Sequence, residues 1–171
     1  MKRITAVIIC MLILVSACAG GIKQESKGFG KSDLNFELNG KVFALNSDVK
    51  ALLTELGDSY EFSEAPSCVY EGTDKTYEYA HISIYTYPVK DKDHIDEIVL
   101  TGSSYKTVKS IRTGSTLEEV VAAYGNNYKD EGGMITYRLE PDNMKSPSLY
   151  FVVEDGVVSS ISYYSASNII N

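Results

Sequence analysis

The chain has 171 residues and a formal net charge of −7 at pH 7, with 23 acidic residues against 16 basic ones. A chain this acidic is repelled by phosphate backbones, so nucleic acid is not expected as a partner. Its length suits one domain with a single hydrophobic core, once a short N-terminal segment is set aside.

Residues 1–17 have the pattern of an export signal. Lys2 and Arg3 form a positive n-region, and the stretch from Ile4 to Val15 is apolar apart from one threonine. This stretch is shorter than the roughly 20 residues that a membrane-spanning helix needs. We therefore predict a signal peptide over residues 1–17. Its removal leaves 14 of the 16 basic residues against 23 acidic ones, a formal charge of −9.

The sequence LVSACAGG places Cys18 among small residues directly after the apolar stretch. Residues 15–18 resemble the lipobox of bacterial lipoproteins, in which the cysteine thiol receives a diacylglyceryl group. Two acyl chains anchor a protein stably, whereas a single chain binds a membrane only reversibly. The resemblance implies that Cys18 is the lipid attachment site of a protein in the bacterial cell envelope, facing outside the cytoplasm. An ordinary cleavage site with an incidental cysteine is the alternative.

A tether is expected after the lipidated cysteine. Residues 19–32 (AGGIKQESKGFGKS) are rich in Gly, Lys and Ser. A chain of this composition is flexible, with a root-mean-square reach of roughly 20 Å over this length. We therefore predict a lipidated cysteine and tether over residues 18–32, followed by one globular domain over residues 33–171.

Cys68 is the only cysteine left for this domain, because Cys10 lies in the signal peptide and Cys18 is predicted to carry lipid. An intrachain disulfide is therefore not expected. We predict that Cys68 is a small, half-buried residue of a strand. A reactive thiol or an intermolecular bridge is the alternative, which no histidine or lysine pair near it in the sequence favours.

Two segments 68 residues apart predict a pair of short amphipathic helices, SDVKALLTELG from Ser47 and STLEEVVAAYG from Ser115. Each begins with a serine that can cap a helix, and Glu118 completes a capping box in the second. Apolar residues recur at i, i+3, i+4 and i+7, which indicates one buried face. Gly57 and Gly125 are expected to end the two helices.

Strand-like stretches follow each helix: residues 68–72, 76–88 and 95–102 after the first, and 134–140, 148–154 and 157–165 after the second. Asn39-Gly40 and Asp155-Gly156 predict two-residue hairpin turns. The first copy has a longer loop, VKDKDH, where the second has Asp155-Gly156, and the stretch KTVKSIRTG predicts a strand before the second helix.

The predicted fold is α+β, with two β-α-β-β-β repeats over residues 33–106 and 107–171. Side by side, these repeats form one antiparallel sheet with both helices packed on one face.

Strand parity predicts a tyrosine-rich open face on this sheet. If Ile82 and Ile84 lie under the helices, alternate residues of the same strand point the other way. The residues predicted for the open face are Tyr77, Tyr79, His81, Tyr85, Tyr87, Tyr150 and Tyr164. Tyrosine is enriched at protein interfaces, so these residues are the predicted partner-binding site. The alternative is that cross-strand tyrosine pairs only stabilise an exposed sheet.

The stretch RTGSTLEEVVAAYG resembles the repeat opening of β-lactamase inhibitor protein and of SmpA/OmlA-type lipoproteins of outer-membrane assembly. The first copy departs from this pattern, with Asn46 and Lys50 where Gly114 and Glu118 stand in the second. The resemblance implies a tandem α/β sandwich whose open sheet binds another protein. It identifies no partner, and no inhibitory residue carries over to this sequence.

No catalytic pattern is evident. His81 and His94 are the two histidines, and no G-x-S-x-G motif is present. The acidic stretch DKDHIDE, from Asp91 to Glu97, lacks the glycine and glutamate that an EF-hand loop requires, and a solvated loop is favoured over a calcium site.

We predict a lipid-anchored module that binds an envelope or secreted protein, with no cofactor, no metal and no enzymatic activity. A surface lipoprotein that binds a glycan or small ligand is the alternative, and a minor hydrolase is the third possibility. The absence of tryptophan makes sugar stacking less expected.

Overall fold

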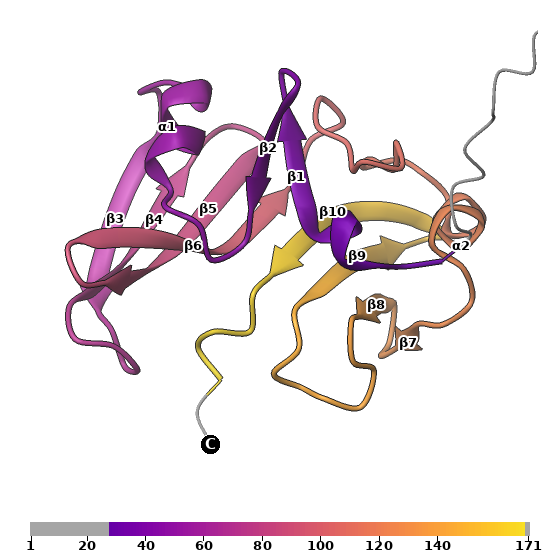
Figure 1. Ribbon diagram of the computed structural model, residues 1–171. Helices are drawn as coiled ribbons and strands as arrows, with labels where there is room; N and C mark the ends of the chain where they lie inside the picture. Colours follow the sequence, from indigo (N-terminus) through magenta and orange to yellow (C-terminus); the bar gives the residue numbers. More distant parts are fainter. Residues whose placement is uncertain (1–27, 170–171) are drawn as a thin grey trace, which may run out of the picture.

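The computed structural model describes residues 28–169, which fold on an antiparallel eight-stranded sheet (Figure 1). The predicted signal peptide and the predicted lipid site, Cys18, lie outside the described residues. In chain order the elements are the 3-10 helix η1 (Lys31–Leu34), β1 (Asn35–Leu38), β2 (Lys41–Ala44), α1 (Lys50–Leu56), β3 (Glu61–Pro66), β4 (Thr73–Glu78), β5 (Ile82–Val89), β6 (Lys92–Leu100), α2 (Leu117–Tyr124), β7 (Lys129–Asp130), β8 (Met134–Arg138), β9 (Ser148–Glu154) and β10 (Val157–Tyr164).

The strand order of the large sheet is β3-β4-β5-β6-β10-β9-β8-β7. Strands β3 to β6 form one antiparallel meander after α1, and β7 to β10 form another after α2. The two meanders join at the centre, where Ile161 of β10 pairs with Leu100 of β6. The predicted α+β class, with one dominant antiparallel sheet and two helices, is confirmed at this level.

One face of the sheet, here called the helix side, carries a continuous buried row. Through successive strand pairs the buried row contains Tyr77, Ile84, Ile98, Tyr163, Leu149 and Tyr137, and it ends at the exposed Phe62 of the edge strand β3. Both helices contribute side chains to the core on this side, including the fully buried Leu52 of α1 and Val120 of α2. The burial of these apolar surfaces is the main source of stability in the fold.

Each helix is also tied to the helix side by a tyrosine. The Tyr79 hydroxyl donates to the Gly57 carbonyl oxygen at 2.9 Å, and the Tyr137 hydroxyl donates to the Gly125 carbonyl oxygen at 2.7 Å. Gly57 and Gly125, with φ of 83° and 87°, follow the last residues of α1 and α2. Both helices therefore end at the predicted glycines, and both lie on the same face.

The β1–β2 hairpin corrects the predicted repeat. Its Asn39-Gly40 turn has the positive φ values of 52° and 75° that the sequence predicted, as does Asp155-Gly156 with 50° and 81°. However, β1 and β2 form a two-stranded sheet of their own. Phe36 of this hairpin packs against Tyr163 on the helix side, with ring centroids 6.1 Å apart. Figure 1 shows α1, this hairpin and α2 in succession along the sheet.

No strand lies between β6 and α2 within the described residues. The predicted strand KTVKSIRTG is a chain of turns, in which the Thr107 amide donates to the Ile111 carbonyl oxygen at 2.8 Å. The predicted β-α-β-β-β order is therefore wrong. The helix α1 is followed by the four strands β3 to β6, and α2 is followed by the four strands β7 to β10.

The helix starts differ from the prediction by a residue or more. In α2 the cap is Thr116: the Glu119 amide donates to its Oγ1 at 3.2 Å, and the Thr116 amide donates to Glu119 Oε2 at 2.9 Å. Ser115 instead accepts a hydrogen bond from the Arg112 amide at 3.3 Å. Ser47 does not cap the start of α1, because its hydroxyl donates to the Ala44 carbonyl oxygen.

The first meander differs most from the prediction. The stretch 76–88 is two strands, because Ala80 and His81 form a turn closed by the Tyr79 amide bonding to the Ile82 carbonyl oxygen at 2.9 Å. Residues 68–72 form turns instead of a strand, and β3, not predicted, is an exposed edge strand. The expected VKDKDH loop is a two-residue turn, since Val89 pairs with Lys92.

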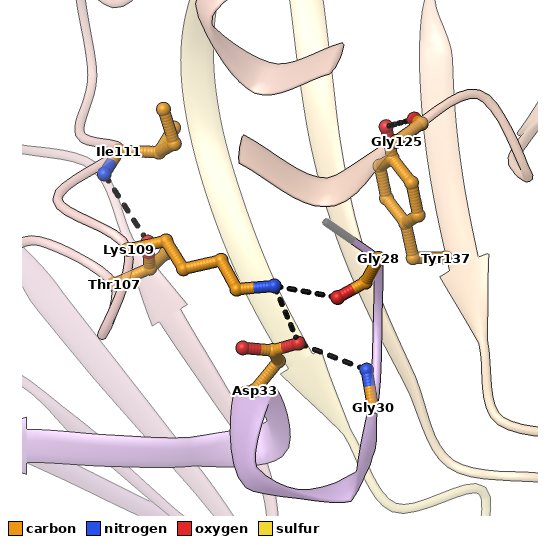
Figure 2. A network of polar contacts seen from close by, with 8 residues as sticks. All are labelled: Gly28, Gly30, Asp33, Thr107, Lys109, Ile111, Gly125 and Tyr137. Carbon is orange, nitrogen blue, oxygen red and sulfur yellow. Dashed lines mark hydrogen bonds and ion pairs between the residues drawn. The ribbon is translucent and has the colours of Figure 1, made fainter. Parts of the chain in front are cut away.

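The domain begins earlier than predicted, because residues 28–32 are packed against it (Figure 2). The Lys109 ammonium donates to the Gly28 carbonyl oxygen at 2.6 Å and to Asp33 Oδ2 at 3.0 Å. The same Asp33 oxygen accepts from the Gly30 amide at 2.9 Å. Phe29 packs on Tyr137 with ring centroids 5.7 Å apart. The predicted tether therefore does not extend over these residues.

Candidate functional site

The candidate site is the face of the large sheet opposite the helix side, here called the open face. On it Tyr85 of β5 and Tyr164 of β10 occupy the two pairing positions on either side of Glu97 of β6. Ser162 of β10 pairs with Tyr150 of β9 on the same face. These five residues, Tyr85, Glu97, Tyr150, Ser162 and Tyr164, are called the Glu97 cluster below. The helices and the β1–β2 hairpin all pack on the other side, so they leave this cluster uncovered.

Three of the predicted partner-binding residues belong to this cluster. Tyr85, Tyr150 and Tyr164 are each half-buried, so part of every side chain meets solvent. The rings of Tyr150 and Tyr164 lie 6.2 Å apart between centroids, with an interplanar angle of 53°. Burial raises the pKa of all three hydroxyls, so they remain neutral hydrogen-bond donors at physiological pH.

The prediction that Tyr77 and Tyr79 lie on the open face is wrong. Tyr77 pairs with Ile84 under the helices, and only 7% of its surface is exposed. The Tyr79 hydroxyl bonds to Gly57 at the end of α1, and burial raises the pKa of Tyr79 to about 12. The cause is the β4–β5 turn, which reverses the chain and brings the residues before it onto the same face as Ile84.

His81 lies in that turn and not on a strand. Its side chain is exposed, and a Cβ added at Gly102 would come within 2.5 Å of the His81 Cβ. The Thr101 amide donates to the His81 carbonyl oxygen at 3.0 Å. His81 therefore marks one end of the sheet, at close contact with the chain that leaves β6, and is not part of the Glu97 cluster.

Tyr87 points to the open side, but other residues cover it. Tyr70 stacks on it with ring centroids 4.8 Å apart, and the Tyr87 hydroxyl donates to Asn46 Oδ1 at 3.0 Å. The Tyr70 hydroxyl in turn donates to the carbonyl oxygen of Ser167, at 2.8 Å, in the segment after β10. With 7% of its surface exposed, Tyr87 is not available for a partner, contrary to the prediction.

Glu97 is a carboxylate with no cationic partner among residues 28–169. Its Oε1 accepts hydrogen bonds from the Ser162 hydroxyl and, at 3.4 Å, from the Tyr150 hydroxyl. None of the ion pairs between described residues includes Glu97. Burial raises its pKa above the ordinary value, and the adjacent charge of Asp96 adds to this rise.

A β-bulge places the two acids side by side. The register passes from Tyr85 opposite Glu97 to Thr86 opposite Ile95, so Asp96 is an extra residue in β6. Asp96 is 5% exposed and accepts hydrogen bonds from the Ser165 hydroxyl and, at 2.6 Å, from the Asn168 amide. Asp96 therefore holds the segment after β10, whereas Glu97 faces the cluster.

The remaining predictions concern Cys68 and the acidic stretch. Cys68 is free and exposed between β3 and β4, so its predicted half-buried strand position is wrong. The stretch from Asp91 to Glu97 lies in the β5–β6 turn and in β6 itself, where Asp93 forms an ion pair with Lys75 at 2.9 Å. Among residues 28–169, no group of three or more His, Cys, Asp or Glu side chains is placed to hold a metal ion.

The helices of the described region are too short to cross a membrane. A scan against protein-family models found no match, and searches of curated proteins and of solved structures found none either.

Sequence reasoning found the tyrosines of the cluster but missed Glu97 and Ser162. The sequence predicts a solvated loop at Glu97 and a strand at Ser162, with no site at either position. The signal that identifies both is cross-strand register: once β5, β6 and β10 are paired, each lies beside a tyrosine.

Proposed function

We propose that this chain is a lipid-anchored module of a bacterial cell envelope, exposed outside the cytoplasm, that binds another protein with the open face of its sheet. The observation that carries this proposal is the Glu97 cluster, in which half-buried tyrosines surround a carboxylate on a face that the helices leave free. Tyrosine offers a large apolar body with a polar end, which suits protein interfaces.

The N-terminal segment bears on how a lipid anchor at Cys18 would orient the domain. Phe29 packs against Tyr124 and Tyr137, which belong to α2 and to the helix side of β8. A chain that leads from Gly28 towards an acylated cysteine therefore starts on the helix side. The open face is then free to point away from the lipid attachment.

Mass spectrometry of the mature N-terminus tests the anchor. We expect an acylated Cys18 as the first residue. A mature chain that keeps Met1, or that has an unmodified thiol at residue 18, would contradict the lipid assignment without affecting the binding proposal.

We also propose that the two halves are tandem copies of one α-β-β-β-β unit. Backbone bonds before each helix support this. The Asn46 and Gly114 amides donate to Ile95 and Val158 carbonyl oxygens, both at 2.8 Å. Asn46 and Gly114 stand 68 residues apart and share positive φ values of 63° and 89°, so asparagine and glycine fill the same left-handed position.

Aromatic contacts after each helix support the same equivalence. Tyr60 packs on Tyr79 with centroids 5.4 Å apart, and Tyr128 packs on Tyr137 at 5.7 Å. Tyr60 and Tyr128 are again 68 residues apart, and Tyr79 and Tyr137 are the residues that bond to the helix ends. Finally, each last strand has a bulge just after the bonded residue, at Asp96 in β6 and at Ser159 in β10.

Photo-crosslinking in the living host tests the binding function. A photoreactive amino acid replaces Tyr85 or Tyr164 on the open face, and Val42 of the β1–β2 hairpin, 61% exposed, serves as the control on the other side. We expect one defined protein adduct from the open-face positions and none from Val42. Equal labelling at all three positions, or no adduct at Tyr85 and Tyr164, would contradict the proposal.

A further inference from the structure

Glu97 is half-buried, and its hydrogen-bond partners among residues 28–169 are neutral, as are those of the more deeply buried Asp96 beside it. The hydrogen-bond donors to Glu97 are the hydroxyls of Ser162 and Tyr150, and Ser162 is 6% exposed. A sheltered carboxylate without a cation is unfavourable, and a cation placed beside it recovers much of the lost interaction. A positive charge brought to this point of the open face would therefore be stabilised by Glu97.

The fold itself does not require an acid at this position. If the two halves are equivalent, the residues at and after the bulge are Asp96 and Glu97 in the first half, and Ser159 and Ser160 in the second. The second bulge forms with two neutral hydroxyl side chains. Glu97 is thus a feature of one half and not a structural need of the unit.

Tyrosine rings stand on both sides of this carboxylate. Tyr85 and Tyr164 occupy the pairing positions opposite Glu97 on the neighbouring strands. Side chains at such positions have Cβ atoms about 4.5–5.5 Å apart, within reach of a cation held by the carboxylate. A ring face within about 6 Å of an ammonium or guanidinium group attracts it through the cation–π interaction.

The charged side chains beside Glu97 on strands β4 and β6 are acidic, whereas Arg138 of β8, which pairs with Ser148, is a basic residue on the same face beyond Tyr164. The exposed Glu78 lies on the same face, since it pairs with Ser83, and Asp96 adjoins Glu97 in the chain. The chain as a whole carries a formal charge of −7. A partner with a basic surface is therefore complementary to this part of the open face.

From this geometry we infer that the Glu97 cluster receives a lysine or arginine side chain of the bound protein, with the carboxylate as counter-ion and the rings of Tyr85 and Tyr164 as walls. This inference rests on the proposed function and adds the chemistry that the partner must present. The partner then places a basic residue at the centre of its interface, where a fully enclosed charged pair has the largest effect on affinity.

NMR titration of the ¹⁵N-labelled full chain tests the inference with defined probes. The probes are the N-acetyl amides of lysine and arginine, with the N-acetyl amide of norleucine as the uncharged control, at constant ionic strength. We expect saturable shifts of the Glu97 and Ser162 amides with the two cationic probes, and at least fivefold weaker binding of the norleucine probe. Equal binding of all three probes, or no saturable shift with lysine and arginine, would overturn the inference.

Two matched substitutions sharpen this test. Glu97→Gln keeps the shape of the side chain and removes its charge, whereas Glu78→Gln makes the same charge change at an exposed site of the same face. We expect at least fivefold weaker lysine-probe binding by E97Q and unchanged binding by E78Q. Equal loss in both variants would indicate a general electrostatic effect and would refute a specific site.

The photo-crosslinking experiment separates the two proposals. If E97Q retains the crosslinked adduct at full yield while Tyr85 and Tyr164 remain labelling positions, the binding face stands and the basic side chain at Glu97 is refuted. If the open-face positions give no adduct at all, the proposed function itself fails.

Discussion

The two faces of the eight-stranded sheet bury different kinds of side chain. The helix side buries an apolar row in which Ile84, Leu149 and Tyr137 are 0% exposed. The open face shelters Glu97 behind neutral hydroxyls, with half-buried tyrosines around it. Apolar burial stabilises the fold, whereas a sheltered carboxylate without a cation opposes it. Residues of the first kind are explained by folding, and we propose that residues of the second kind serve binding.

The largest effect is expected from a cavity on the helix side. Phe151 of β9 is 0% exposed and contacts the rings of Tyr124 and Tyr137. Phe151→Ala should lower the free energy of unfolding by about 3–5 kcal/mol, measured by urea denaturation. Tyr85→Ala on the open face should lower it by about 1 kcal/mol. An equal loss of unfolding free energy in the two variants would contradict the proposed difference between the faces.

The second effect concerns the buried ion pair that fixes the N-terminal segment on the helix side. The side chains of Asp33 and Lys109 are 4% and 14% exposed. Asp33→Asn should cost about 3 kcal/mol, because it leaves the Lys109 charge without its carboxylate. The control is Glu131→Gln in the exposed pair with Lys129, which should leave the urea midpoint unchanged. A stable D33N protein would show that this ion pair does not hold the segment.

A smaller effect is expected from single hydroxyl groups on the two faces. Tyr137→Phe removes the bond to the Gly125 carbonyl oxygen and should cost about 1 kcal/mol. Tyr164→Phe removes a hydroxyl from the open face and should leave the thermal midpoint unchanged. A loss of stability in Y164F as large as in Y137F would place Tyr164 in the structural part of the molecule.

The smallest expected effect has the opposite sign. Because burial raises the pKa of Glu97 above 4.5, the folded state holds this proton more tightly than the unfolded chain does. The stabilising contribution is therefore complete below pH 4.5 and is lost as pH rises through the raised pKa.

Glu97→Gln removes this titration. We expect E97Q to have a higher thermal midpoint than the unsubstituted protein at neutral pH, and a smaller decline as pH rises from 4.5. The exposed Glu78→Gln variant should follow the unsubstituted protein. A midpoint for E97Q below that of the unsubstituted protein at neutral pH would show that the carboxylate contributes to folding.

The sequence predicted the second half of the sheet better than the first, for a physical reason. Asp155-Gly156 and Asn39-Gly40 are residues that adopt positive φ readily, so both hairpins were evident. The β4–β5 turn consists of Ala80 and His81, which are not typical of tight turns, and tyrosines continue on both sides of it. Strand parity therefore predicts the wrong face of the sheet for Tyr77 and Tyr79.

Other differences come from tertiary packing that no local pattern encodes. Ser115 and Thr116 are both suitable caps, and the backbone bonds to Gly156 and Val158 select the second. Phe29 lies in a Gly-, Lys- and Ser-rich stretch, but Tyr124 and Tyr137 provide a surface that holds it. Glu97 could not be singled out before the neighbours of β6 were known.

The double variant Tyr85→Ala/Tyr164→Ala tests most directly whether the open face contributes little to stability and is used for binding. Thermal denaturation and the yield of the crosslinked adduct, with the photoreactive group at Glu78 on the same face, are measured on the same protein. We expect a thermal midpoint close to that of the unsubstituted chain and an adduct reduced at least tenfold. A variant that unfolds, or one that keeps the adduct at full yield, would contradict this account.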